Sequence, residues 1–526
     1  MFKWVRKLVD LFNKTDESIE TLLTQEVLDE RQQNILYEAL DKDAFHVSAQ
    51  AVSEDVPTVS DLLPEEEKDV SPASDLSYKQ QLYKDALYAA RHNPAKWRLR
   101  EHFIDDIRTT YDMWQSNIVP AHICEAMVEP LPVDALFLVL FAPEFVEALV
   151  YNHNVDPENI IFFGDDDGLN GAVKMLYGVH KGGILNKDMS TLSSILTEGI
   201  TVKFDKLVVV GNPPYQEMDG GEGVVSASPI YNKFVEIIID NLSPDYLTFI
   251  VPSKWMTGGK GLDSYRQRML MDRRMTSITH FPNSGDVFPT VSIEGGVSYF
   301  LWEKAHKNSN DNRCLITVGD TKVKKYLDEH DIVLLDLDAE SILNKVQECT
   351  TSYMSMSVLP QKPFGIRNNF SDWKEAGIPC YKRGRELRYC DEDVVTDRYN
   401  IINKWKVCVS AANGAAQKED GVKAKNVLTY TLLLPPGTTC TESYVVLNTF
   451  EVNENAEAFI TYVKTKFFRF MLGLRVLTPT ISRDKFSWVP DMGDYTKEWT
   501  DTDLYDMFNL SDDERAYIEA KIKPLV

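Results

Sequence analysis

The feature that most constrains this chain is an apolar run that stops at two consecutive prolines. Residues 204–211 read Phe-Asp-Lys-Leu-Val-Val-Val-Gly, and Asn212-Pro213-Pro214-Tyr215 follow directly. Such a run predicts a buried strand, which proline cannot continue because it has no backbone N–H. Open α/β sheets bind their ligands just beyond the carboxyl ends of strands. We therefore expect the tetrapeptide to form part of a ligand site.

The groups of this tetrapeptide suit a planar substrate that carries an NH2 group. Pro213 restricts the backbone, so that the Asn212 side chain and the adjacent carbonyls can be held as hydrogen-bond acceptors. Tyr215 offers an aromatic face beside them. The alternative interpretation is a strand that turns on two prolines with a tyrosine packed behind it.

Other apolar runs alternate with helical patterns, which predicts an α/β fold. Residues 118–128 have apolar residues at helical spacing, with Pro120 at the expected helix start. Further strands are expected at residues 135–141, 159–164 and 246–252, and residues 295–302 are expected to form an antiparallel partner strand.

From about Asn117 to the C-terminus, the chain resembles the adenine-specific DNA methyltransferases that use S-adenosylmethionine, of the type found in modification enzymes and type IIG restriction systems. The C-terminal part of the resemblance lies in residues 362–370, 462–470 and 480–490. The resemblance implies an α/β fold, with a Rossmann-like class I methyltransferase domain over residues 117–355. It also implies an α+β target-recognition domain over residues 356–526.

The activity implied by this resemblance is methylation of adenine N6 in a specific sequence of double-stranded DNA. Asn212, Pro213, Pro214 and Tyr215 would be the catalytic residues, and the target base would be flipped out of the duplex. Tyr215 and Phe288 would stack on that base; a core phenylalanine is the competing explanation for Phe288.

The same resemblance implies a cofactor site, although one of its usual motifs is absent. Relatives carry a glycine-rich turn after the first strand, whereas residues 142–148 read Ala-Pro-Glu-Phe-Val-Glu-Ala. Either Glu144 or Glu147 takes over polar contacts to the cofactor, or the site is degenerate. Asp165 or Asp166 would bind the ribose, although this run of aspartates is also typical of a solvated loop. The cofactor-binding candidates are Pro120, Pro143, Glu144, Asp165, Asp166 and Asp188.

Basic residues interleaved with aromatic ones provide candidates for DNA contacts. Charged helix faces that are simply solvated are the alternative. The candidates are Lys254, Lys260, Arg266, Arg383, Lys464, Lys466 and Arg483. The seven cysteines are scattered, so we expect neither a metal site nor a disulfide framework.

The formal net charge of −24 opposes a uniformly basic nucleic-acid-binding surface. Much of the acidity lies outside the expected site, notably in residues 46–76, which carry eight carboxylates and one lysine. We expect these residues to be a disordered acidic linker between a helical segment at 1–45 and a helical lead-in at 77–116. No apolar stretch approaches the length of a membrane span. With the scattered cysteines and no apolar export signal at Met1–Lys7, this predicts a cytoplasmic protein.

Two other functions remain open at this point. The glycine-free turn and the acidic charge are compatible with a catalytically degenerate methyltransferase fold that acts as a DNA-binding or decoy protein. Asn-Pro-Pro-Tyr also occurs in methyltransferases that modify a protein glutamine, but those enzymes are shorter and lack a large C-terminal recognition domain. We expect no fused nuclease, and the oligomeric state remains open.

Overall fold

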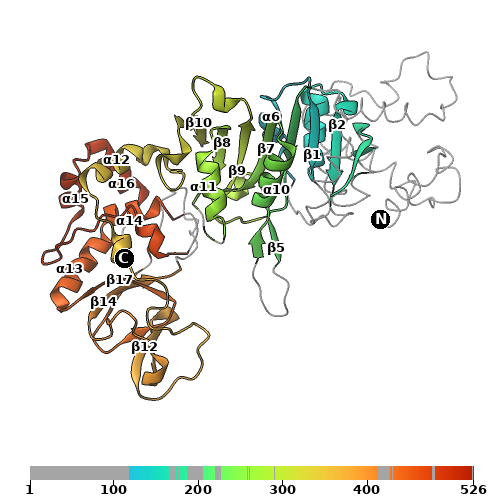
Figure 1. Cartoon of the computed structure of the whole chain (residues 1–526). Coiled ribbons are helices and arrows are strands. Elements are labelled where there is room, and N and C mark those ends of the chain that lie inside the picture. The colour runs from blue at the N-terminus through green and yellow to red at the C-terminus, as the bar shows by residue number, and fades with distance from the viewer. Residues whose placement is uncertain are drawn as a thin grey trace, which may run out of the picture.

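The computed structural model describes residues 118–164, 170, 173–174, 177–185, 205–218, 227–257, 259, 261–289, 291–412, 427–428, 430–476, 480–523 and 525. The helical segment, acidic linker and helical lead-in expected within residues 1–116 lie outside this description. The described part consists of a large sheet with flanking helices, followed by a C-terminal region of helices and small sheets (Figure 1). None of the described helices is both long enough and apolar enough to cross a membrane.

A nine-stranded sheet forms the framework of the first region, in the order β11-β10-β8-β9-β7-β4-β1-β2-β3. From β1 the chain adds β2 and β3 on one side and then returns to place β4 on the other. Strands β1 to β4 and β7 are parallel, and β9 runs antiparallel between β7 and β8. The strands are β1 (Leu136–Leu140), β2 (Ile160–Gly164), β3 (Lys181–Ile184), β4 (Leu207–Gly211), β7 (Tyr246–Pro252), β8 (Met275–Phe281), β9 (Val297–Glu303), β10 (Cys314–Val318) and β11 (Thr321–Lys325).

Helices cover both faces of this sheet, because the central strands are apolar on both sides. All five residues of β1 are buried. Phe137 and Val139 share a core with α6 (Ala121–Val128) and α7 (Pro143–Glu147). Leu138 and Leu140 share the opposite core with α10 (Tyr231–Ile237) and α11 (Asp263–Met271). The sheet is therefore the middle layer of an α/β/α sandwich.

This architecture confirms the expected mixed α/β fold with a large and largely parallel sheet. The structure forms β7 over the predicted residues 246–252, whereas β4 begins at Leu207, three residues after the start of the predicted run. Residues 204–206 carry two charges, and their polarity does not favour a strand buried on both faces.

The C-terminal region contains two three-stranded sheets, in the orders β13-β12-β16 and β15-β14-β17. Its strands are β12 (Ile378–Lys382), β13 (Glu386–Cys390), β14 (Trp405–Ser410), β15 (Thr431–Leu434), β16 (Thr439–Cys440) and β17 (Tyr444–Phe450). Helices α13 (Asn453–Lys464), α14 (Lys466–Gly473), α15 (Asp501–Met507) and α16 (Asp512–Lys521) pack beside them.

Residues 331–334, which we call the connector, join the two regions, and their side chains pack against both. Ile332 and Leu334 lie in the core of the C-terminal region, whereas Val333 lies in a core of the large sheet. Helix α12 (Glu340–Cys349), which follows, packs in the C-terminal core. This packing crosses the domain boundary that we expected between residues 355 and 356.

Candidate active site

The candidate site lies where the strand order reverses, at the carboxyl ends of β1 and β4. Leu140 and Gly211 are register partners there, and the Asn212 N–H donates to the Leu140 carbonyl oxygen at 3.3 Å. A Cβ at position 211 would lie 2.3 Å from that oxygen, so glycine is required for this close approach. Doubly wound α/β sheets bind ligands at such a reversal point.

The tetrapeptide continues from β4 as a largely buried segment. The Asn212 side chain is only 2% exposed, and Pro213 and Pro214 are buried. The Ile230 N–H donates to the Tyr215 carbonyl oxygen at 3.2 Å, which anchors the end of the segment to the start of α10. The backbone is therefore anchored at both ends of the tetrapeptide, and the Asn212 side chain is buried.

Tyr215 is half-buried, and its hydroxyl is in the interior. Burial and the nearby negative charge of Glu144 raise the pKa of Tyr215 well above its ordinary value. Within the described residues, this buried hydroxyl has no hydrogen-bond partner. A buried hydroxyl without a partner is unfavourable, and a polar ligand atom would relieve that cost.

Glu144 brings three segments of the site together. Its side chain is 3% exposed, and Oε1 accepts the Val119 N–H at 2.7 Å, beside Pro120 at the start of α6. Pro143 occupies the first turn of α7, which places Glu144 immediately after β1. The buried Glu144 carboxylate therefore joins the backbone just before α6 to the turn after β1, close to Tyr215. Glu147, the other candidate for this role, instead accepts the Tyr177 hydroxyl at 3.2 Å.

The glycine-free turn uses a left-handed residue that the sequence did not suggest. Phe141 has φ = 63°, and its N–H donates to the Phe163 carbonyl oxygen at 2.8 Å. Its ring packs against Phe234 with ring centroids 5.5 Å apart, on the α10 face of the sheet. Phe141 thus adopts a conformation normally given to glycine, at a cost of about 1–2 kcal/mol. We expected it to be an ordinary last residue of the strand.

A buried hydrogen-bonded pair stands at the ends of β7 and β8. Ser253 Oγ and His280 Nδ1 are 2.8 Å apart, and both side chains are buried. The Ser253 N–H also donates to the Gly296 carbonyl oxygen at 3.0 Å. This pair fixes the backbone that leads into Lys254, which is half-buried. Sequence analysis missed it because 27 residues separate the two partners.

The structure places Phe288 in the interior, where its side chain is 1% exposed. It belongs to the same apolar cluster against which Tyr215 packs. The two residues proposed to stack on the base thus contact the same apolar core. The placement in a closed core corresponds to the competing explanation for Phe288, and base stacking by Phe288 stays a prediction.

Several other predicted site residues cannot be placed. Asp165, Asp166, Asp188 and Lys260 lie outside the described residues. Asp165 directly follows Gly164, the last residue of β2, and that strand is a parallel neighbour of β1.

Three predicted DNA-contact residues are already engaged within the protein. Arg266 donates to Asp263 at 2.8 Å and to the Asp331 carbonyl oxygen at 3.1 Å. Lys466 pairs with Glu519, and Arg483 donates to the Ser355 carbonyl oxygen at 2.6 Å. Lys464 and Arg383 are exposed.

The arginines at the end of α11 lie at the opposite edge of the sheet. Arg273 and Arg274 precede Met275 at the amino end of β8, whereas Asn212 follows a carboxyl end. With Arg268 they line an open cleft of about 780 Å³. Each has a carboxylate partner: Asp240 for Arg268, Asp328 for Arg273 and Asp272 for Arg274. This placement keeps these three arginines away from the tetrapeptide.

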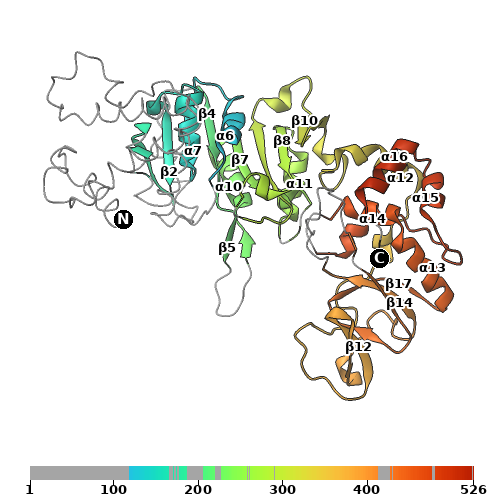
Figure 2. The ribbon, with the colours of Figure 1, turned by 180° about the vertical axis from the view of Figure 1, so that it is seen from behind.

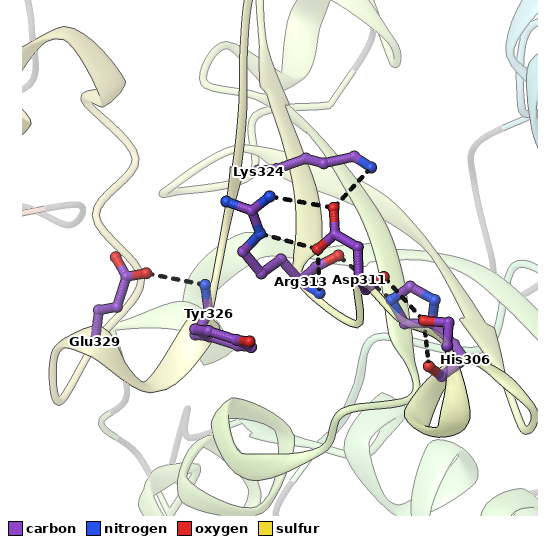
Figure 3. Close-up of polar contacts among 7 residues, drawn as sticks. His306, Asp311, Arg313, Lys324, Tyr326 and Glu329 are labelled. Carbon is purple, nitrogen blue, oxygen red and sulfur yellow. Dashed lines mark hydrogen bonds and ion pairs between the residues drawn. The ribbon is translucent and has the colours of Figure 1, made fainter.

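The same neutralisation extends to the β10–β11 edge of the sheet. Asp311 accepts from Arg313 at 2.9 Å and from Lys324 at 3.3 Å, and Glu329 accepts the Tyr326 N–H (Figure 3). Arg313 and Lys324 at this edge are therefore held by a neighbouring carboxylate.

Comparison with known families identifies one region. The model of the Eco57I restriction-modification methylase matches residues 182–288, which include the tetrapeptide, β7 and Phe288. A protein of Mycoplasma pneumoniae described as an uncharacterized adenine-specific methylase is 37% identical over 126 residues. That match covers 24% of this chain and 28% of the relative, so the chain spans less than a third of the relative's length.

Comparison with solved structures gives matches to restriction–modification proteins at low sequence identity and with TM-scores below 0.5. The type IIL restriction-modification enzyme MmeI, solved in complex with DNA, has a TM-score of 0.37 and 8% identity, covering 78% of this chain and 73% of that one. The modification subunit of a putative type I restriction enzyme from Vibrio vulnificus has a TM-score of 0.32 and 16% identity, covering 58% and 64%. A type I methyltransferase subunit from Streptococcus thermophilus has a TM-score of 0.29 and 15% identity, covering 44% and 53%.

Proposed function

We propose that this protein is a DNA adenine N6-methyltransferase of the restriction–modification type, without a fused nuclease. The observation that carries the proposal is the buried Asn212 at the carboxyl end of β4, beside the end of β1. The Eco57I methylase match over residues 182–288 and the adenine-specific methylase relative support the same reaction class. Residues 356–526 are proposed to recognise the DNA target.

The chemistry required is the orientation of a weakly nucleophilic amine. The lone pair of an exocyclic amine is delocalised into the ring, and it becomes available as the nitrogen turns tetrahedral. The Asn212 Oδ1 atom and the Pro213 carbonyl oxygen would accept the two N–H bonds and favour that geometry. Because Asn212 is buried and anchored, these acceptors are preorganised for the charge that develops on nitrogen.

The residues present fit S-adenosylmethionine, which supplies a methyl group on a positively charged sulfonium. The buried Glu144 carboxylate would face a cationic part of this cofactor. Pro120 and Pro143 shape the two backbone segments that meet at Glu144. Phe141 provides the left-handed turn for which relatives use glycine, and its ring is turned into the core. Asp165, Asp166 and Asp188 remain candidates for the nucleoside part.

The substrate base would have to leave the duplex to reach this site. Tyr215 offers a half-buried ring next to Asn212. Stacking on this ring would contribute about 1–3 kcal/mol and so offset part of the cost of unstacking the base. Double-stranded DNA is therefore the proposed partner.

The direct test is transfer of labelled methyl from S-adenosylmethionine to unmodified DNA. We expect methylated adenine with the wild type and a loss of about 100- to 1000-fold for Asn212→Ala, which removes one preorganised acceptor. Asn312→Ala is the matched control, because Asn312 lies near the opposite edge, where its Nδ2 donates to the Lys307 carbonyl oxygen at 3.2 Å.

Calorimetry with the cofactor alone separates the possible outcomes. Cofactor binding that survives in Asn212→Ala, together with lost transfer, supports the catalytic role of Asn212. Wild-type protein that neither binds the cofactor nor transfers methyl would contradict the proposal and leave the degenerate binding protein. Methylation of cytosine in place of adenine would show that the proposed substrate base, adenine, is wrong.

A further inference from the structure

The hairpin formed by β12 and β13 concentrates positive charge in an acidic protein. Between Lys382 and Arg388 the chain carries four cations and a single carboxylate, Glu386. Glu386 pairs with both Lys382 and Arg388, which belong to the two strands. The two arginines of the tip, Arg383 and Arg385, have no carboxylate partner among the described residues.

The tip is rigid and exposed. The Tyr444 hydroxyl accepts the Arg385 N–H at 2.9 Å and donates to the Lys382 carbonyl oxygen at 3.0 Å, so one buried side chain holds both sides of the turn. The Arg385 guanidinium lies 4.0 Å from the ring centroid of Tyr430. A Cβ at Gly384 would meet no atom within 4 Å, which shows open space around the turn.

The backbone of this turn carries a conformational cost. Gly384 has φ = 81°, and Arg385, which follows, has φ = 65°. Glycine or asparagine would adopt the second conformation more readily than arginine. A strained residue held by surrounding contacts often marks a functional position. Here the contacts keep a guanidinium at the exposed tip.

The hairpin and the segment that follows the tetrapeptide lie on the same side of the molecule. In both views, β12 at the end of the C-terminal region and β5 (Gln216–Met218), which follows the tetrapeptide, project toward the same side of the molecule (Figures 1 and 2). β5 begins four residues after Asn212, so the tetrapeptide lies close to the start of this projection. A ligand that contacts both sites would have to extend along this side from the tetrapeptide to the hairpin.

We propose that the tip of the β12–β13 hairpin enters the major groove of the target DNA and that Arg383 determines specificity there. The inference deepens the proposed function and depends on it for the identity of the partner. The major groove admits a two-stranded ribbon, and arginine binds the O6 and N7 atoms of guanine with two hydrogen bonds. Arg385, which also lacks a carboxylate partner among the described residues, would contact a phosphate and position the hairpin. The recognised sequence therefore contains a guanine at the position that Arg383 contacts.

The test compares three variants of the full chain by duplex binding over a salt series and by mapping of methylated adenines. Arg383→Ala should bind its preferred duplex about 10- to 100-fold more weakly and lose its preference at one guanine. Arg383→Lys should keep the salt dependence but lose the same preference, since lysine carries the charge without the planar guanidinium. Arg313→Gln, which removes an arginine held by Asp311 at the β10–β11 edge, is the control and should bind as the wild type does.

The outcomes separate the hairpin from the proposed reaction. Sequence-specific binding without methyl transfer would leave the hairpin proposal standing and overturn the enzyme. Methylation at the same sequence by Arg383→Ala would overturn the hairpin proposal alone, as would equal loss of binding in Arg313→Gln. Tighter binding of RNA than of duplex DNA by the wild type would also overturn it. Thermal unfolding of each variant establishes that the C-terminal region remains folded.

Discussion

At the residue scale, Phe141 shows how the first turn of the site forms without glycine. Its backbone is left-handed, and its ring fills space beside Phe234. The two properties oppose each other energetically. Burial of the ring stabilises the fold, whereas the left-handed conformation costs about 1–2 kcal/mol for a residue with a Cβ. Phe141 therefore contributes core packing at the cost of an unfavourable backbone conformation.

This opposition predicts an unusual order of stability. Phe141→Ala should destabilise the protein by about 3–5 kcal/mol, because it leaves a cavity and keeps the Cβ. Phe141→Gly removes the same ring but relieves the backbone, so it should be about 1 kcal/mol more stable than the alanine variant. Chemical denaturation measures both values. Phe145→Ala and Phe145→Gly are the matched pair, since Phe145 is buried inside α7, where glycine should be the less stable. An alanine variant of Phe141 that is the more stable would contradict the left-handed turn.

Glu144 carries the second prediction at this scale. Glu144→Gln keeps an oxygen that can accept the Val119 N–H but removes the negative charge. If the carboxylate faces a cationic cofactor, affinity for S-adenosylmethionine should fall by about 10-fold, which corresponds to the loss of about 1.4 kcal/mol. Calorimetry measures this value. Glu158→Gln removes an exposed carboxylate near the start of β2 and is the control.

The demethylated product adds a second comparison for the same variant. S-adenosylhomocysteine lacks the sulfonium charge but keeps the amino group. A loss confined to S-adenosylmethionine would place Glu144 near the sulfonium, and equal losses would place it near the amino group. Unchanged affinity for both ligands would rule out a cofactor contact by Glu144.

At the element scale, the central strands could be predicted from the sequence, because each is marked by a continuous run of apolar residues. The run at residues 246–252 is apolar throughout, and β7 occupies those residues. Asn212 could be predicted at the end of β4 for the same reason, since Pro213 marks the end of that run. An apolar run and a proline are recognised from neighbouring residues alone, whatever packs against the strand in the folded protein.

The hydrogen-bond and ion-pair partners of charged and polar side chains could not be predicted from the sequence. Arg266 was a candidate for phosphate contact, but its contacts include the Asp331 carbonyl oxygen, 65 residues away. Lys466 pairs with Glu519 of α16, and Ser253 meets His280 only because β7 and β8 flank the same strand. Such contacts follow from the assembled fold, and neither periodicity nor spacing indicates them.

At the scale of the whole molecule, the connector couples the large sheet to the C-terminal region. Val333 packs into the core of the sheet, and its neighbours Ile332 and Leu334 pack into the C-terminal core. The Val333 N–H also donates to the Met256 carbonyl oxygen at 3.1 Å. On the other side, Arg475 forms two hydrogen bonds of 2.6 Å with the Asp331 carboxylate. The connector thus packs against both the large sheet and the C-terminal core.

This coupling predicts that a substitution that destabilises one core also increases hydrogen exchange in the other core. Val333→Ala removes side-chain contacts from the sheet core, yet we expect faster hydrogen exchange in α14 of the C-terminal region as well as in α10. Ile332→Ala, one residue away, should likewise increase exchange in both helices, at a cost of about 2–5 kcal/mol in unfolding free energy. Val323→Ala is the control, because Val323 packs against the same sheet core as Val333 but is only half-buried and lies on the outer strand β11, outside the connector. If each substitution changed exchange only in its own core, the two regions would open independently, and the connector would not couple them.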